Sequence, residues 1–136
     1  MQPLTSGDYD LQEAASALLS RTHSPAQHRV AVAVRGGSGA IYVGLSLKSP
    51  RVDVCAEPSA IANARMGGED VIETFVAVGM DPGDKPLVIN PCGVCRELIP
   101  HYAPHARMIV NIGTTVGVVS VSELLPLPWV RARSYG

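Results

Sequence analysis

Two cysteine motifs constrain this sequence more than any other feature, because they can act together only if the fold joins distant segments. A Cys-Ala-Glu triplet at 55–57 opens one predicted helix, and a Pro-Cys-Gly-Val-Cys stretch at 91–95 opens another. A C-x-x-C at a helix start lets two sulfurs converge on one ion, and Cys55 is the only cysteine left to supply a third. A shared ion therefore requires a fold that brings the two helix starts side by side.

Helices and strands alternate along the chain. The predicted helices span 9–21, 56–66 and 92–102, with one helical turn at 122–125, and the predicted strands span 29–35, 40–47, 71–79, 87–89, 108–112 and 116–121. Ser6 or Asp8 is the expected N-cap of the first helix, and residues 50–54 are a connector. This order predicts a single domain over 1–136, an α/β fold with a mixed sheet and helices on its faces. Both cysteine motifs follow strands at the rim of that sheet, where sites usually form.

Composition and charge narrow the classes of function. The 136 residues are 46% hydrophobic and 17% charged, with a formal net charge of −1. No basic face is evident, so we expect a small-molecule substrate and no nucleic-acid polymer as partner. No segment resembles a signal peptide or a membrane span, and three cysteines do not suit a disulfide framework. We therefore expect a cytoplasmic protein without membrane contact, whose cysteines bind a metal or act in redox chemistry.

Three thiolates suit Zn²⁺, and we predict one ion per chain held by Cys55, Cys92 and Cys95. Three protein ligands leave a fourth position for water, which is typical of catalytic zinc. The positive ends of both helices help to keep the thiolates ionised. Glu57 lies two residues after a ligand, where it can move protons from water to the ring nitrogen and leaving amine of a cyclic amidine. These residues predict a zinc-dependent hydrolytic deaminase.

Other interpretations of the same residues stay open. A histidine could complete a purely structural zinc site, and the candidates are His23, His28, His101 and His105. A thioredoxin-like redox C-x-x-C would leave Cys55 without a role. Glu57 could be an ordinary first-turn glutamate that the helix dipole favours.

The motifs resemble those of the small cytidine deaminase family, including its blasticidin S deaminase branch. The stretches at 55–61 and 91–98 are similar to the family's two zinc motifs, and 123–126 is similar to a frequent C-terminal element. The resemblance implies a three-layer helix–sheet–helix sandwich with a mixed five-stranded sheet. It also implies a homotetramer whose neighbouring chains contribute to each pocket. The implied activity is ammonia release from a cytidine-like or related aminated heterocycle. Alternatives are a deaminase of blasticidin S-type nucleoside antibiotics and a non-catalytic zinc- or ligand-binding protein of the same fold.

Two positions depart from the family and bear on the substrate. Ser46 stands where the family has an asparagine and Lys48 where it has a glutamate, the pair that binds the ribose hydroxyl. A cation therefore replaces a hydroxyl acceptor, and we predict a substrate with an anionic group near Lys48. The other interpretation of Lys48 is a solvated lysine at the end of a strand.

The resemblance implies further substrate contacts. Ala56 would use its backbone N–H and Asn90 its backbone carbonyl, whatever the Asn90 side chain does. Trp129 or Tyr135 would close over a substrate, and packing on the core or at a subunit interface is the alternative. The family's arginine after the Cys-Ala-Glu triplet is replaced by Pro58, so Arg96 and helix N–H groups are the candidates to moderate the thiolate charge.

Overall fold

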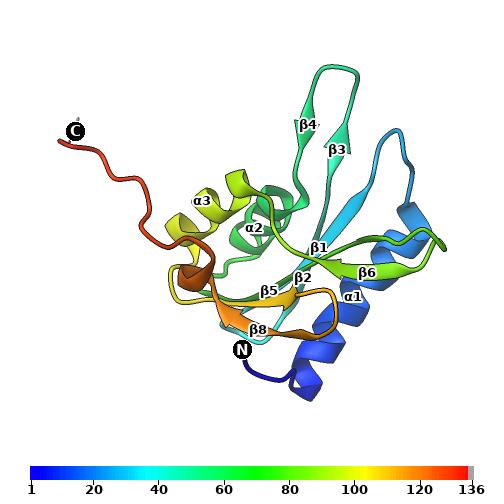
Figure 1. The fold of residues 1–136 in the computed structure, drawn as a ribbon, viewed down its shortest axis with the longest axis horizontal. Coiled ribbons are helices and arrows are strands. Elements are labelled where there is room, and N and C mark those ends of the chain that lie inside the picture. Colours follow the sequence, from blue (N-terminus) through cyan, green and yellow to red (C-terminus); the bar gives the residue numbers. More distant parts are fainter. Residues whose placement is uncertain (135–136) are drawn as a thin grey trace.

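A mixed β-sheet separates one helix from two others in the computed structural model, which describes residues 1–134 (Figure 1). The helices are α1 (Ser6–Thr22), α2 (Ala56–Met66) and α3 (Gly93–Tyr102), followed late in the chain by the 3₁₀ turn η1 (Val121–Leu124). The strands are β1 (Val30–Gly36), β2 (Ile41–Leu45), β3 (Leu47–Lys48), β4 (Asp53–Val54), β5 (Ile72–Met80), β6 (Pro86–Ile89), β7 (Arg107–Asn111) and β8 (Val116–Ser120). No helix within residues 1–134 is both long enough and apolar enough to cross a membrane.

Alternating side chains of the central strand β1 divide the core into two layers. Val32 and Val34 are buried in the cluster that contains the inner faces of α2 and α3. Ala31 and Ala33 point the other way, into the cluster that contains the inner face of α1. A strand covered on both faces has no polar side, which is why its sequence is almost continuously apolar.

The strand order is β2-β1-β5-β7-β8, and β6 also pairs with β5. β5 is antiparallel to β1 and β6 and parallel to β7, so the sheet is mixed. β6 pairs with residues 77–80 of β5, whereas β7 pairs with Thr74 and Phe75. Because β1 occupies the other edge of β5, β6 and β7 share one position, and the six strands fill five positions across the sheet. The predicted sandwich with a mixed sheet of five strand positions is confirmed.

The start of α1 differs from the prediction. Its N-cap is Thr5, not Ser6 or Asp8. The Thr5 hydroxyl accepts from the Asp8 backbone N–H at 3.2 Å, and the Asp8 carboxylate accepts from the Thr5 N–H at 2.9 Å. This reciprocal capping box satisfies two N–H groups, whereas a cap at Ser6 or Asp8 would leave them unpaired.

The predicted connector at 50–54 is also more ordered than expected. Asp53 and Val54 form β4, which pairs with β3 in a short antiparallel ladder that projects from the main sheet (Figure 1). The predicted strand 40–47 is interrupted at Ser46, whose hydroxyl accepts from the backbone N–H groups of Arg29 and Val30 at 3.1 and 3.0 Å. A side chain thus replaces the backbone acceptor, and the chain leaves the main sheet.

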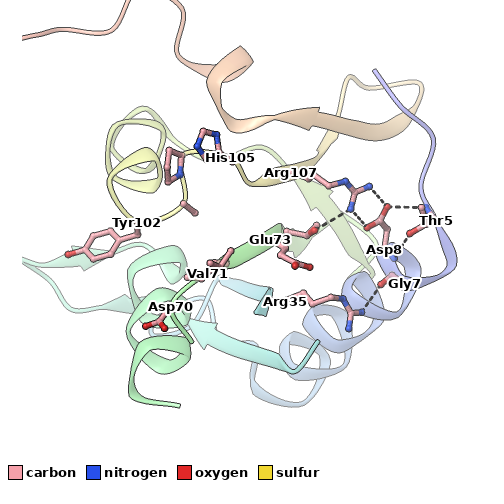
Figure 2. A pocket seen from close by; sticks show the side chains of 14 residues that line it. Thr5, Gly7, Asp8, Arg35, Asp70, Val71, Glu73, Tyr102, His105 and Arg107 are labelled. Atoms are coloured by element: carbon pink, nitrogen blue, oxygen red, sulfur yellow. Dashed lines mark hydrogen bonds and ion pairs between the residues drawn. The ribbon is translucent and has the colours of Figure 1, made fainter. Parts of the chain in front are cut away.

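Asp8 and Arg107 pin α1 to the sheet at the end where β5 begins (Figure 2). Arg107 donates to both Asp8 carboxylate oxygens at 2.7 Å and to the Thr74 hydroxyl at 3.2 Å. Arg35, on the other side of Thr74, donates to the Gly7 carbonyl at 3.0 Å. These groups line a cavity of about 540 Å³, and hydrogen bonds from the Arg107 guanidinium hold the pKa of Asp8 below its usual range.

We predict that Asp8→Asn lowers the free energy of unfolding by about 2 kcal/mol at pH 7, because a charge-assisted buried hydrogen-bond pair is lost. Since the folded-state pKa is depressed, this contribution is present above the ordinary carboxyl pKa and disappears as the pH falls through the folded value. Urea unfolding of both proteins between pH 7 and pH 2.5 measures the difference.

The matched control is Asp10→Asn, which neutralises an exposed aspartate of the same helix. It should change stability by less than about 0.5 kcal/mol. Equal losses for the two variants, or a loss at Asp8 that does not depend on pH, would contradict this interpretation.

Candidate active site

The candidate site lies where the N-termini of α2 and α3 meet. Cys55 is the N-cap of α2 and Cys92 is the N-cap of α3. The Cys55 side chain makes no capping hydrogen bond, whereas the Cys92 sulfur faces the backbone N–H groups of Val94 and Cys95 at the start of α3. Both sulfurs lie where the two helix starts meet. The first N–H groups of each helix have no partner within the helix, which makes the meeting point electropositive.

Three sulfurs converge at this point. The Sγ atoms of Cys55, Cys92 and Cys95 all lie within 4.8 Å of one another, and those of Cys55 and Cys92 are 3.4 Å apart. Two sulfurs bound to a tetrahedral Zn²⁺ at about 2.3 Å each lie about 3.8 Å apart, so this arrangement fits the ion. Within residues 1–134 no histidine or carboxylate joins the cluster. The histidine-completed structural site is therefore not formed within one chain.

The surroundings of the three thiols differ. Burial raises the pKa of Cys95, which is fully enclosed, and burial also raises the pKa of Cys55. Burial acts in the same sense on Cys92. Hydrogen bonds outweigh the effect of burial there and lower the pKa of Cys92; they come from the backbone N–H groups of Cys95 and Val94 and from the thiols of Cys55 and Cys95. The start of α3 thus stabilises the Cys92 thiolate, as expected for a helix N-terminus.

Glu57 lies beside the cluster without belonging to it. Its side chain is buried, with 4% of the residue exposed. Burial raises the pKa of the Glu57 carboxyl, and hydrogen bonds from its own backbone N–H and from the Cys95 thiol act in the opposite direction. No cation in residues 1–134 pairs with this carboxylate. An enclosed carboxyl with a raised pKa is suited to exchange protons.

One cavity of about 230 Å³ joins the predicted residues. Its lining comprises Arg29, Val30, Ser46, Asp53, Cys55, Ala56, Glu57, Ile89, Asn90 and Cys92. Ser46, Ala56, Glu57 and Asn90 were predicted together with the thiols, and the structure brings them to one cavity. The sequence analysis did not identify four lining residues, which carry no motif of their own: Arg29, Val30, Asp53 and Ile89. Val30 could have been found from its position in β1, whose backbone pairs with Ser46.

Lys48 does not line this cavity. It lies in a separate hollow with Ala26, Gln27, Ser49 and Pro50, and its ammonium group is 3.6 Å from the Asp53 carboxylate. Asp53 in turn lines the cavity of about 230 Å³ beside Glu57, so Lys48 is next to that cavity through its ion-pair partner.

Trp129 also lies away from the cavity within the single chain. It is 70% exposed and stacks with Arg131 in a hollow beside α3, on the segment that runs away from the sheet (Figure 1). Tyr135 lies outside the described residues. Arg96, a candidate to moderate the thiolate charge, donates its Nε–H to the Pro91 carbonyl at 2.9 Å.

Gly44 lets the start of α2 approach the sheet. A Cβ atom at this position would lie 2.4 Å from the Ala60 nitrogen and 2.7 Å from the Ala56 carbonyl oxygen. Any larger residue would therefore push α2 outward and carry Cys55 and Glu57 with it. The close approach of β2 and α2 is thus part of the geometry of the site.

We predict that replacing any one of the three cysteines by alanine lowers zinc affinity at least about 100-fold, because removing a direct ligand costs more than removing its hydrogen-bond partner. Zinc content after dialysis, measured by mass spectrometry, should be one ion per chain in the wild type. Glu57→Gln, which changes a residue outside the cluster, should keep that ion. Zinc retained at full stoichiometry in all three cysteine variants would contradict the assignment.

Comparison with known proteins places this geometry in a family. The family described as cytidine and deoxycytidylate deaminase zinc-binding region matches residues 6–112. Blasticidin-S deaminase of Bacillus cereus is 33% identical over 130 residues, which cover 91% of this chain and 93% of that protein. Cytidine deaminase of Shewanella pealeana is 33% identical over 90 residues, which cover 63% of this chain and 27% of that protein.

Solved structures agree with these matches. The cytidine deaminase from Burkholderia pseudomallei superposes with a TM-score of 0.74 at 25% identity, covering 93% of this chain and 100% of that one. The cytidine deaminase from Bacillus anthracis has the same TM-score, 0.74, at 22% identity, a likeness that shows the fold alone. Since the family match includes both cysteine motifs and the thiol cluster is in place, the chain belongs to the family of zinc-binding cytidine and deoxycytidylate deaminases.

Proposed function

We propose that residues 1–136 form a single deaminase domain that releases ammonia from a cytidine-like or related aminated heterocycle, with Glu57 as general acid/base. The observation that carries this proposal is the position of Glu57. Its buried carboxyl lines the same cavity as Cys55 and Cys92 but does not join their cluster. A structural zinc site has no need of such a carboxyl, whereas a hydrolytic reaction needs a group that moves protons.

Cys55, Cys92 and Cys95 would hold the zinc. When bound, Zn²⁺ supplies a Lewis acid that lowers the pKa of a water molecule. The Glu57 carboxylate takes a proton from water and gives it to the ring nitrogen as the water oxygen bonds to the amine-bearing carbon. Glu57 then takes the remaining proton from the hydroxyl on that carbon and delivers it to the exocyclic nitrogen. The carbon–nitrogen bond breaks, ammonia leaves, and a carbonyl replaces the amine.

Two backbone groups are suited to orient the heterocycle. Ala56 is the first residue of α2, so its N–H has no acceptor within the helix and is available for a substrate oxygen. Asn90 lines the same cavity and belongs to the segment between β6 and α3. Its carbonyl would accept a hydrogen bond from the leaving amine. Both contacts use the backbone and are therefore independent of residue type.

A nucleoside antibiotic is one candidate substrate, because the Bacillus cereus relative that spans nearly the whole chain is a blasticidin-S deaminase. We propose that the substrate carries an anionic group that extends from the cavity past Asp53 toward Lys48. The support for this proposal is that Asp53 lines the cavity and its carboxylate lies 3.6 Å from the Lys48 ammonium. A non-catalytic zinc- or ligand-binding protein of the same fold is the alternative, and the experiments below separate the two.

We also propose a homotetramer, in which a neighbouring chain covers surfaces that one chain leaves exposed. Met66 of α2, Val94 of α3 and Trp129 are 80%, 75% and 70% exposed in the single chain, and a neighbouring chain would cover them. Three free thiols at one site suit a reducing compartment, which supports a cytoplasmic location.

We predict that Glu57→Gln lowers kcat by about 10²- to 10⁴-fold, because the amide cannot accept the proton from water. Ammonia release would be measured over a panel of cytidine, deoxycytidine, cytosine, cytidylates, blasticidin S and aminated purines. Zinc content and melting temperature would be measured on the same samples, and both should match the wild type.

Glu97→Gln is the matched control, since Glu97 is an exposed glutamate two residues after Cys95 and lines a different hollow. It should keep wild-type kcat. Turnover retained in zinc-loaded Glu57→Gln would overturn the role of Glu57. Absence of turnover in the zinc-loaded wild type across the panel, with a ligand-induced rise in melting temperature, would favour the binding protein instead.

For a substrate with a carboxylate or phosphate, we predict that Lys48→Ala raises KM about fivefold and leaves kcat unchanged, which corresponds to about 1 kcal/mol for a partly exposed charge pair. A neutral analogue of the same heterocycle should show no change. Lys85→Ala, at an exposed turn far along the sequence, is the control for loss of one positive charge. An unchanged KM for the anionic substrate would remove Lys48 from the substrate site.

A further inference from the structure

We infer that the Asn90 side chain, anchored to the backbone of Asn111, positions the catalytic segment between β6 and α3. Asn90 would therefore act as a positioning residue in the proposed deamination, on which this inference rests. The sequence analysis assigned Asn90 a backbone contact only and gave its side chain no role. The structure assigns the side chain a separate function, in holding that backbone where the cavity requires it.

The segment that carries Cys92 has no strand partner of its own. β6 ends at Ile89, where its last register partner is Ala77 of β5, and α3 begins at Gly93. Asn90 and Cys92 both line the catalytic cavity from this short connection. A connection without ladder hydrogen bonds needs other anchors if its atoms are to keep their positions.

The Asn90 amide supplies two such anchors. Its Nδ2 donates to the Asn111 carbonyl at 2.9 Å, and its Oδ1 accepts from the Asn111 backbone N–H at 2.8 Å. The side chain thus bonds to both backbone groups of one residue, as an opposing strand residue would in a hydrogen-bonded antiparallel pair. It bonds to the last residue of β7 and ties the segment before α3 to the sheet.

Asn111 completes the connection with its own side chain. Its Nδ2 donates to the Val88 carbonyl at 2.9 Å, and its Oδ1 accepts from the Gly113 N–H at 2.7 Å. β6 and β7 both pair with β5, and the register pairs within residues 1–134 do not join them to each other. The two asparagines therefore supply the polar cross-links between these strands next to the site.

A further hydrogen bond anchors the helix side of the segment. Arg96 of α3 donates its Nε–H to the Pro91 carbonyl at 2.9 Å. Asn111 thus holds the Val88 carbonyl and the Asn90 side chain, and Arg96 holds the Pro91 carbonyl. Movement of the cavity wall would break at least one of these bonds, and a misplacement of about 1 Å can lower a rate by about 100-fold.

The same bonds limit what the Asn90 side chain can offer a substrate. One lone pair of its Oδ1 and one N–H of its amide are already used by Asn111. Half of the hydrogen-bonding capacity of the amide is therefore committed to Asn111. The side chain should therefore affect the rate of the chemical step more than the affinity for substrate.

The test compares Asn90→Ala with Asn63→Ala in the zinc-loaded full chain. Asn63 of α2 also donates an amide N–H to a backbone carbonyl, that of Val43, at 3.0 Å, and it does not line the cavity. Asn90→Ala should lower kcat about 10- to 100-fold and change KM less than about threefold. Amide hydrogen exchange over residues 88–95 should accelerate at least tenfold. Asn63→Ala should leave both quantities at wild-type values.

Asn90→Asp is the second variant, in case the alanine protein does not fold. It keeps an acceptor for the Asn111 N–H but places a carboxylate oxygen against the Asn111 carbonyl, so exchange over 88–95 should again accelerate. Wild-type kcat and wild-type exchange in the Asn90 variants would overturn the inference, as would an equal loss of kcat in Asn63→Ala. If the wild type deaminates nothing, the proposed function fails, and the exchange measurement still decides whether Asn90 anchors the segment.

Discussion

The convergence of three sulfurs on one point is the constraint on which the rest of the structure depends. Cys55 and Cys92 are separated by 36 residues, yet their Sγ atoms are 3.4 Å apart. Reaching that distance requires two helix N-termini at one edge of the sheet, and each is positioned by a different device. For α2 it is Gly44, whose missing side chain lets the helix start lie against β2. For α3 it is the group of hydrogen bonds from Asn111, Asn90 and Arg96 around the preceding segment.

The two ends of the sheet use polar groups in opposite ways. At the end where β5 begins, Asp8 and Arg107 satisfy each other, and the Arg35 guanidinium bonds to backbone carbonyls (Figure 2). These groups stabilise the fold, and the cavity beside them, about 540 Å³, is larger than the cavity of about 230 Å³ beside Glu57. At the end with the thiol cluster, Glu57 is enclosed, and no cation within residues 1–134 forms an ion pair with it. The size of a cavity is therefore a poorer guide to function here than the state of its buried charges.

The sequence predicts those features that depend on local patterns. The helix predicted over 56–66 begins and ends where α2 does, and the cysteine spacing predicts the cluster because ligands at helix starts follow from short motifs. Three other features were not predicted. Nothing local distinguishes Asn111 from an ordinary polar residue at a strand end, and its role follows from a register that joins it to Asn90. Thr5 replaced the expected caps because it forms the reciprocal pair with Asp8, and Lys48 turns toward Asp53 because β3 and β4 pair.

We expect one zinc ion to be held by the three thiolates, with a fourth position open to the cavity. X-ray absorption at the zinc edge of the purified, zinc-loaded protein measures this coordination. The spectrum should show three sulfur ligands at about 2.3 Å and one oxygen ligand at about 2.0 Å, because no histidine or carboxylate within residues 1–134 joins the thiol cluster. A spectrum that requires an imidazole nitrogen or a fourth sulfur would contradict it. The ion would then be structural, and the cavity beside Glu57 would not be a hydrolytic site.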